Sequence, residues 1–308
     1  MINYKISKYI YKYLNKDNNK QGQYNKKLKS YLQKGGYNYQ DAMDILRYIG
    51  CIINDTNCNI HEKGNKIQSN EKPYLLILYG PPACGKTFSG EFIIKKLNLK
   101  NNYINLNVDQ FVYDSNQFQE SKIDLTKFQN ITIDEIDKNP QLQLIEDNYR
   151  KIRLKTDFLL QILKNISIMF KYNVVLETTG GAIDFYFKYI INDYYYKKYN
   201  IYLVFPYTNN INILFDRSIE RGLKECRFVP KEYFKFNFMK SQKNFLKVIN
   251  KDNIIKFNGI YVYDIKKFDY QKEDFCDSIL FKYEKIDNKI IKSKENDKFI
   301  NQIKKINE

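Results

Sequence analysis

The sequence predicts an α/β protein of three layers, in which helices cover both faces of a five-stranded, mostly parallel sheet. A loop rich in small residues lies between an apolar run and a helical segment, in YLLILYGPPACGKTFSGEF at 74–92. Apolar runs then alternate with helical segments along the chain, the order that produces a parallel sheet between helices. Hydrophobic residues make up 43% of the 308, which is enough for a sizeable core.

Five short apolar runs predict the strands. Each is nearly continuous in apolar residues, as expected of a strand whose two faces are both covered. The runs span 74–79, 103–108, 173–177, 201–207 and 259–264.

Helical spacing of apolar residues predicts the segments between the strands. The predicted helices span 87–99, 144–170, 182–198, 209–223 and 231–250, and the polar stretch 110–145 is expected to be irregular.

The domain boundaries follow from changes in this pattern. Residues 1–72 are expected to form a basic helical N-terminal extension, and 73–268 the core, with an arginine-bearing lid near 217–230. Residues 269–308 are expected to be a C-terminal decoration that ends in a lysine-rich tail, a solvated helix or a frayed end.

The formal net charge is +16, and half of it comes from residues 1–34, with nine lysines and one aspartate. Such a segment attracts nucleic acid, which makes nucleic acid a candidate partner. The even scatter of lysine, without an arginine-rich block, favours instead an ordinary solvated surface.

Two further features bear on location. The five cysteines form no repeated close pairs, which is typical of a reducing compartment. The first residues lack the apolar stretch of a signal peptide, and no apolar run reaches membrane-spanning length. We therefore expect a soluble cytoplasmic protein without a membrane partner.

The loop after the first predicted strand fits the phosphate-binding pattern G-x-x-x-x-G-K-[ST], with the strand before it and the helix after it that this P-loop requires. Lys86 is expected to reach the β- and γ-phosphates, and the Thr87 hydroxyl to bind Mg²⁺. ATP or GTP is the expected co-substrate. The predicted nucleotide-binding residues are Gly80, Pro81, Pro82, Ala83, Cys84, Gly85, Lys86, Thr87 and Phe88.

Carboxylates end two further predicted strands. Asp109 follows the second strand and Glu177 ends the third, so both are expected beside the γ-phosphate at the carboxyl edge of the sheet. One of them can accept a hydroxyl proton, and the other can hold Mg²⁺ or position the acceptor. Thr178 and Thr179 follow Glu177 and are expected to contact the acceptor with it.

Arginine is scarce, with six residues against 45 lysines, yet Arg217, Arg221 and Arg227 lie within eleven residues. Phosphoryl transfer needs permanently charged donors around the transferred group, so all three are candidate catalytic residues. Arg217 and Arg221 share a helix face, and Gly222 begins a turn suited to a closing lid. Salt bridges on a surface helix are the structural alternative.

Several of these segments together resemble the zeta-toxin group of P-loop kinases, over residues 72–265. The matching segments are GPPACGKT, NVDQF, NVVLETTGG, DRSIERGLKECRFVP and GIYVYD. The resemblance implies an adenylate-kinase-like core and phosphorylation of a hydroxyl by ATP or GTP. It also implies that Asp109 is the general base and that Arg221 or Arg227 is a lid arginine.

One departure from that group concerns the acceptor. Its members often carry an arginine three residues after the aspartate, where this chain has Val112. Whatever that arginine binds is expected to be held here by Arg150 or Arg153, or not to be held at all. The acceptor itself stays open among a nucleotide sugar, a nucleotide, a small molecule and a nucleic-acid 5′ end.

Two alternatives use the same loop. The segment ITIDEID at 131–137 resembles the Walker B segment of AAA-type ATPases, although polar residues break the stretch before Asp134. A non-catalytic nucleotide-binding module is the other alternative.

Overall fold

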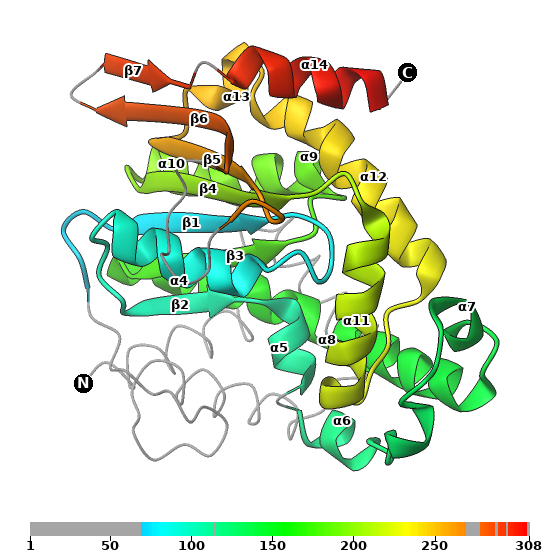
Figure 1. The fold of residues 1–308 in the computed structure, drawn as a ribbon. Coiled ribbons are helices and arrows are strands. Elements are labelled where there is room, and N and C mark those ends of the chain that lie inside the picture. The colour runs from blue at the N-terminus through cyan, green and yellow to red at the C-terminus, as the bar shows by residue number, and fades with distance from the viewer. Residues whose placement is uncertain (1–68, 114, 269–277, 287–288, 294, 307–308) are drawn as a thin grey trace.

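The computed structural model describes residues 69–113, 115–268, 278–286, 289–293 and 295–306. A seven-stranded sheet with the strand order β2-β3-β1-β4-β5-β6-β7 forms its centre (Figure 1). The five predicted strands are confirmed, and all of them are parallel. They are β1 (Tyr74–Tyr79), β2 (Tyr103–Leu106), β3 (Asn173–Thr178), β4 (Asn200–Tyr207) and β5 (Gly259–Asp264).

The C-terminal part of the chain differs from the prediction. Strand β6 (Ile279–Ile286) pairs antiparallel with β5, and β7 (Lys289–Lys292) pairs antiparallel with β6, so the sheet has seven strands rather than five. Helix α14 (Asn296–Ile306) buries Phe299 and Ile303 in the main core, so the tail is neither frayed nor fully solvated. Strand β6 was not predicted because it is not a continuous apolar run: only alternate residues, such as Phe281 and Tyr283, are buried.

Helices cover both faces of the sheet, which confirms the three layers (Figure 1). On one face, Leu76 and Leu78 of β1 pack with α4 (Lys86–Lys96) and α11 (Ile211–Glu225). On the other face, Leu75 and Ile77 pack with α8 (Pro140–Phe170) and α14. A continuous helical segment joins this second layer, formed by α9 (Ile183–Tyr186), the π-helix η2 (Phe187–Ile191) and α10 (Asn192–Tyr196).

Helix α12 (Lys231–Val248) passes from one layer to the other, because Phe234 packs in the first and Phe245 in the second. The short helix α13 (Lys251–Ile254) then leads to β5. No helix within the described ranges is long and apolar enough to cross a membrane.

The stretch expected to be irregular contains four short helices. They are α5 (Val108–Tyr113), α6 (Asn116–Glu120), η1 (Thr126–Phe128) and α7 (Ile133–Ile136). Helix α8 begins at Pro140, earlier than predicted, where the Asn139 side chain accepts from the backbone N–H groups of Gln141 and Leu142.

These short helices have a small core of their own, which we call the cap cluster. Val112, Phe118, Ile136 and Tyr149 are buried in it, together with Phe228 from the turn after α11. The cluster lies beyond the edge where the parallel strands end, at the lower right of Figure 1. It therefore forms a wall opposite the phosphate-binding loop.

Candidate nucleotide and acceptor site

The phosphate-binding loop joins β1 to α4 at the carboxyl edge of the sheet. Gly80 and Ala83 have positive φ values of 137° and 59°, and Gly85, with φ of 90°, caps α4. A Cβ at Gly80 would lie 2.9 Å from the Cys84 Sγ and 3.1 Å from the Phe205 ring, so only glycine fits there. A curled loop of this kind at the start of a helix suits phosphate binding, which uses backbone N–H groups and the positive end of the helix dipole.

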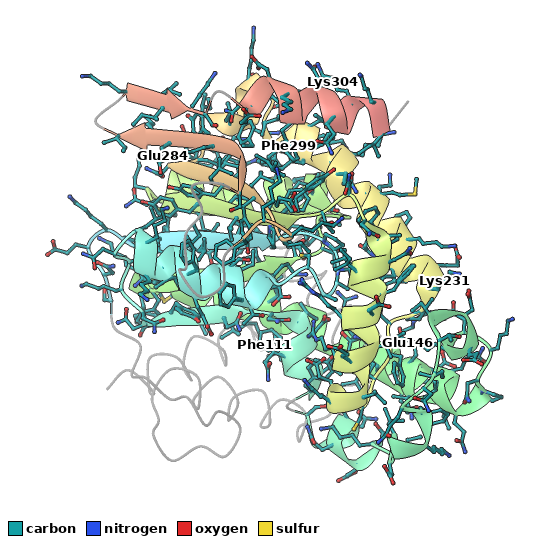
Figure 2. The ribbon with its side chains drawn as sticks, viewed as in Figure 1. Phe111, Glu146, Lys231, Glu284, Phe299 and Lys304 are labelled. Atoms are coloured by element: carbon teal, nitrogen blue, oxygen red, sulfur yellow. The ribbon has the colours of Figure 1, made fainter. Side chains whose placement is uncertain are left out.

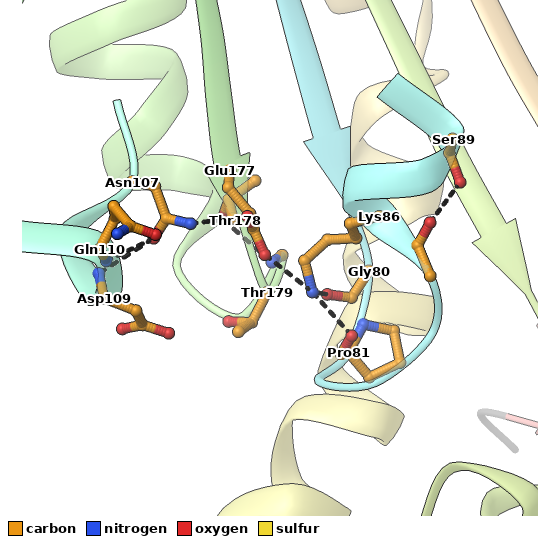
Figure 3. A network of polar contacts seen from close by, with 12 residues as sticks. Gly80, Pro81, Lys86, Ser89, Asn107, Asp109, Gln110, Glu177, Thr178 and Thr179 are labelled. Atoms are coloured by element: carbon orange, nitrogen blue, oxygen red, sulfur yellow. Dashed lines mark hydrogen bonds and ion pairs between the residues drawn. The ribbon is translucent and has the colours of Figure 1, made fainter. Parts of the chain in front are cut away.

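Lys86 is buried at the start of α4 and folds back over this loop. Its Nζ donates to the carbonyl oxygens of Gly80 at 3.0 Å and Pro81 at 2.8 Å (Figure 3). The same Nζ lies 3.6 Å from Glu177 Oε1. The positive charge is therefore already held where phosphate oxygens would bind.

Cys84 and Phe88 serve the core rather than the cavities. Burial raises the pKa of the Cys84 thiol, so it stays protonated and fills space behind the loop. The Phe88 ring packs against Phe268 at 5.7 Å, and its side chain lines neither of the two cavities described below. If Phe88 contacts the nucleotide as predicted, its backbone makes that contact, not its ring.

Thr87 is exposed in the first turn of α4 and lines a small cavity of about 160 Å³. Asn107, Glu177 and Arg221 line the same cavity. Within the described ranges, no three His, Cys, Asp or Glu side chains are grouped to hold a metal. A threonine hydroxyl with the carboxylates of Glu91, Glu177 and Glu225 along the same cavity suits Mg²⁺, which takes its remaining ligands from phosphates and water. The residues therefore fit Mg²⁺ bound together with a nucleotide.

Asn107 links the second and third strands. Its Oδ1 accepts from the backbone N–H groups of Asp109 and Gln110, which starts α5 directly after β2 (Figure 3). Its Nδ2 donates to Glu177 Oε2 at 2.8 Å. Asp109 therefore lies in the first turn of a helix rather than at the strand end, and Glu177 is held between Asn107 and Lys86.

Asp109 is held from the opposite wall by α8. The Tyr149 hydroxyl donates to Asp109 Oδ1, and Arg153 Nε lies 3.6 Å from the same oxygen. Burial alone would raise the pKa of the Asp109 carboxyl, but Arg227, Arg153 and the Tyr149 hydroxyl hold it below its ordinary value. The side chain is still 41% exposed, so an acceptor can reach the ionised carboxylate.

Arg227 is a buried charge in the turn after α11. Its guanidinium lies 3.3 Å from the centroid of the Tyr149 ring, and its Nε donates to Glu146 Oε2 at 2.9 Å. Figure 2 shows Glu146 in the part of the molecule beyond the sheet, on the same side as Lys231.

The turn that carries Arg227 depends on Gly222. A Cβ at Gly222 would lie 2.4 Å from the Phe228 ring and 3.0 Å from the Arg227 carbonyl oxygen. The absent side chain therefore lets the turn fold back onto α11 and place Arg227 in the site.

The other predicted arginines have different surroundings. Arg221 is exposed and pairs with Glu225 on its own helix at 2.7 Å, while Arg150 Nε donates to Glu146 Oε1 at 2.8 Å. Arg217 lies one turn before Arg221 and lines neither cavity. The structure thus brings Arg150, Arg153, Arg221 and Arg227 together but leaves Arg217 outside the group.

These side chains enclose a cavity of about 350 Å³ between the phosphate-binding loop and the cap cluster. Among the described residues, four arginines line it, out of six in the whole sequence. Thr178 and Thr179 also line it, with Pro82, Ala83, Lys86 and Ser218, while their contact with an acceptor stays a prediction. The four acidic residues are Asp109, Glu146, Glu177 and Glu225, and the four tyrosines are Tyr113, Tyr149, Tyr186 and Tyr233.

Comparison with known proteins supports this assignment of the loop. Residues 76–179 match the model of the ATPase family associated with various cellular activities (AAA). Over 255 residues, the chain is 32% identical to "Uncharacterized protein L872" of Acanthamoeba polyphaga mimivirus, an alignment that spans 74% of this chain and 70% of that protein. The chain belongs to the L872 family.

The fold of this L872-family protein is also found among solved structures. A structure of the PezAT chromosomal toxin-antitoxin system of the human pathogen Streptococcus pneumoniae matches it with a TM-score of 0.50. The match covers 88% of this chain and 95% of that chain, at 14% identity, and so shows the fold alone. Together with the family model and the loop geometry, it shows that the chain has a P-loop NTPase-like α/β fold.

The Walker B-like segment does not take part in this site. Residues Ile133–Ile136 form the short helix α7 instead of a strand, and Glu135 closes a capping box with Thr132. Asp134 pairs with Lys231 of α12. The alternative in which IDEID forms a Walker B strand beside the loop is therefore not supported, because the segment has too few apolar residues to enter the sheet.

Sequence reasoning missed Asn107, Glu146 and Tyr149. A signal for the latter two was present in the segment predicted as a long helix. Helical spacing places four of its side chains on one face of that helix, namely Glu146, Tyr149, Arg150 and Arg153. For Asn107, the available signal was its position as a helix-capping residue directly after a strand.

Proposed function

We propose that this L872-family protein is a P-loop kinase that transfers the γ-phosphate of ATP or GTP to a hydroxyl group. The observation that carries the proposal is the shared cavity: Lys86 lies on its nucleotide side and ionised Asp109 on the opposite wall, with arginines around both. A carboxylate opposite the phosphates can accept the proton of the acceptor hydroxyl during phosphate transfer.

In this proposal, the acceptor hydroxyl gives its proton to Asp109 while its oxygen attacks the γ-phosphorus. The bond between the γ-phosphorus and the bridging oxygen breaks, and the nucleoside diphosphate leaves with that electron pair. Lys86 stabilises the negative charge on the transferred group and the leaving phosphate. Mg²⁺, bound at Thr87 with the nucleotide, would neutralise further phosphate charge.

The arginines divide into two roles. Arg221 pairs across one helix turn with Glu225 and is 43% exposed, so its guanidinium can turn towards the transferred phosphate. Arg227 is buried between Glu146 and Tyr149 and holds the wall of the site in place. We assign Arg221 as the arginine that contacts the phosphate.

Arg153 is the proposed replacement for the arginine that relatives carry at the position of Val112. Val112 is buried in the cap cluster and lines neither cavity. Arg153 instead approaches Asp109 from α8. It lies where a cation can bind an acceptor next to the base.

The acceptor class stays open among nucleotide sugars, nucleotides, small molecules and nucleic-acid 5′ ends. The lining tyrosines offer rings for stacking against a base or sugar, and the arginines offer charge for a phosphate or carboxylate. The basic residues 1–34, as a route for nucleic acid, lie outside the described residues.

An acceptor screen by intact mass tests the proposal. The purified full chain is incubated with Mg-ATP or Mg-GTP and with nucleotide sugars, nucleosides, and 5′-hydroxyl RNA and DNA. A mass gain of one phosphate on one acceptor class, absent with Lys86→Ala, supports the kinase. No gain on any acceptor, with steady release of phosphate from the nucleotide, contradicts it.

That second outcome corresponds to an ATPase, which the match of residues 76–179 to the AAA family model favours. An ATPase hydrolyses nucleotide without an acceptor and forms larger assemblies in sizing experiments. Because Glu135 lies in the cap of α7, Glu135→Gln is not expected to trap bound ATP. Glu177→Gln is the variant that tests the carboxylate beside Lys86.

A further inference from the structure

Tyr149 occupies the centre of a chain of contacts that joins α5, α8 and the turn after α11. Its hydroxyl donates to Oδ1 of Asp109, and its ring contacts the Arg227 guanidinium. It is buried, with 2% of its surface exposed, and the ring centroids of Tyr113 and Phe118 are each 6.1 Å away. The ring therefore has little freedom to turn.

Arg227 is fixed in the same way. Its Nε donates to Glu146 Oε2 at 2.9 Å, its Nη1 donates to the Tyr113 hydroxyl at 3.4 Å, and it is 8% exposed. Glu146 in turn accepts from Arg150 through its other oxygen, at 2.8 Å. Glu146 therefore bridges the two arginines, one through each oxygen, and holds the planar Arg227 guanidinium against one face of the ring, which keeps the Tyr149 hydroxyl directed at Asp109.

The hydroxyl determines how the carboxylate is oriented. A donor bound to one carboxylate oxygen restricts rotation of the group, and therefore sets the direction in which the other oxygen can accept a proton. Arg153 adds an attraction at the same oxygen, at 3.6 Å, but its side chain as a whole is 40% exposed, against 2% of Tyr149. The buried tyrosine provides the more rigid restraint.

We propose that Tyr149 is a positioning residue, which holds Asp109 in the orientation that accepts the acceptor proton, and that Arg227 acts on the reaction through Tyr149. This inference rests on the proposed function for the role of Asp109 as the base. Tyr149 itself stays protonated, because burial raises the pKa of its hydroxyl far above the ordinary value. It therefore acts as a donor throughout the working pH range.

The charges around Asp109 set the expected response. Tyr149 and Arg153 face it from α8, and Arg221 and Arg227 from α11 and the following turn, while burial opposes ionisation. Removing the Tyr149 hydroxyl leaves burial in place and takes away one group that favours the charged form. The pKa of Asp109 is therefore expected to rise.

The test uses Tyr149→Phe in the full chain, because phenylalanine keeps the ring, its contact with Arg227 and the packing of the cap cluster. The carboxyl carbon of Asp109 is followed by NMR against pH in protein labelled at aspartate, with its signal identified by its loss in Asp109→Asn. This readout needs no acceptor. The expected result is a pKa higher than in the wild type.

Kinetics with the acceptor found in the mass screen provide the second readout. We expect Tyr149→Phe to lower kcat by roughly tenfold or more with KM for the nucleotide unchanged, and to move the acid limb of kcat/KM to higher pH. The matched control is Tyr261→Phe, which removes a tyrosine-to-carboxylate hydrogen bond of 2.8 Å to Glu284 in the β5–β6 pair. It should change neither the NMR titration nor the pH profile.

Two outcomes would overturn the inference. One is an unchanged Asp109 titration in Tyr149→Phe, and the other is a raised pKa with full kcat. Absence of transfer by the wild type would instead contradict the proposed function, while the NMR titration would still decide whether Tyr149 restrains Asp109.

Discussion

Lys86 Nζ, at the start of α4, lies 3.6 Å from Glu177 Oε1, near the end of β3, although the two residues are 91 positions apart in the sequence. Glu177 is held in turn by Asn107, so the loop after β1, the end of β3 and the start of α5 form one polar unit. A phosphate that enters the loop meets a lysine that is already oriented and partly neutralised.

The first prediction concerns Lys86. Lys86→Ala should abolish transfer, because it removes the buried charge that faces the phosphates, and it also removes the lysine that pairs with Glu177. Transfer of labelled γ-phosphate is the measurement, and a loss of at least ~10²-fold is expected. Lys95→Ala, in the last turn of the same helix, is the control and should retain activity. Transfer that survives in Lys86→Ala would place the phosphate elsewhere.

The second prediction concerns Asp109. Asp109→Asn keeps the size of the side chain but cannot accept the hydroxyl proton, so transfer should fall by roughly 10²–10⁴-fold. Nucleotide binding, measured by calorimetry, should change little, because Asp109 lies across the cavity from the loop. If Asp109→Asn transfers phosphate at the wild-type rate, the base has been assigned to the wrong residue.

The third prediction separates two arginines on one helix. Arg221→Ala should lower kcat by at least ~10²-fold, whereas Arg217→Ala should cost much less, because Arg217 lines neither cavity. Steady-state kinetics of both variants check the difference. Equal losses would support the sequence-based prediction that Arg217 is catalytic and would require α11 to turn during the reaction.

The fourth prediction is a pH dependence. The pKa of Asp109 in the folded chain is lowered, so its ionisation stabilises the fold at pH above the unfolded pKa of about 3.9, and that contribution is lost as pH falls through the folded pKa. The Asp109 carboxylate should therefore stay ionised, and able to act as the base, throughout pH 5–8. Arg153→Gln removes one stabilising cation and should move the acid limb of kcat/KM to higher pH. An unmoved limb would show that Arg153 does not act on Asp109.

The fifth prediction concerns packing. Gly222→Ala places a Cβ 2.4 Å from the Phe228 ring, so the turn that carries Arg227 must shift. The free energy of unfolding should fall by about 1–3 kcal/mol, which urea denaturation measures. Lys224→Ala, at an exposed position of the same helix, should stay within about 0.5 kcal/mol of the wild type. A Gly222→Ala variant as stable as the wild type would show that the turn relaxes freely.

The parallel strands and the phosphate-binding loop could be predicted because their signals are local. The run at 74–79 matches β1 residue for residue, and a strand buried on both faces must be apolar throughout. Strands β6 and β7 could not be recognised in the same way. Many of their residues face solvent, and Ile290 and Ile291 of β7 are 56% and 42% exposed. Because these strands are not buried on both faces, a continuous apolar run does not mark them in the sequence.

The sequence by itself determined the P-loop, the α/β class and the concentration of arginine near the lid, because each depends on neighbouring residues. Only the tertiary structure decided which distant groups meet. Asp109 is 40 positions from Tyr149 and 118 from Arg227, yet one hydroxyl and one ring connect the three. Such contacts depend on how α8 packs beside the turn after α11, and no local pattern of residue types contains that information.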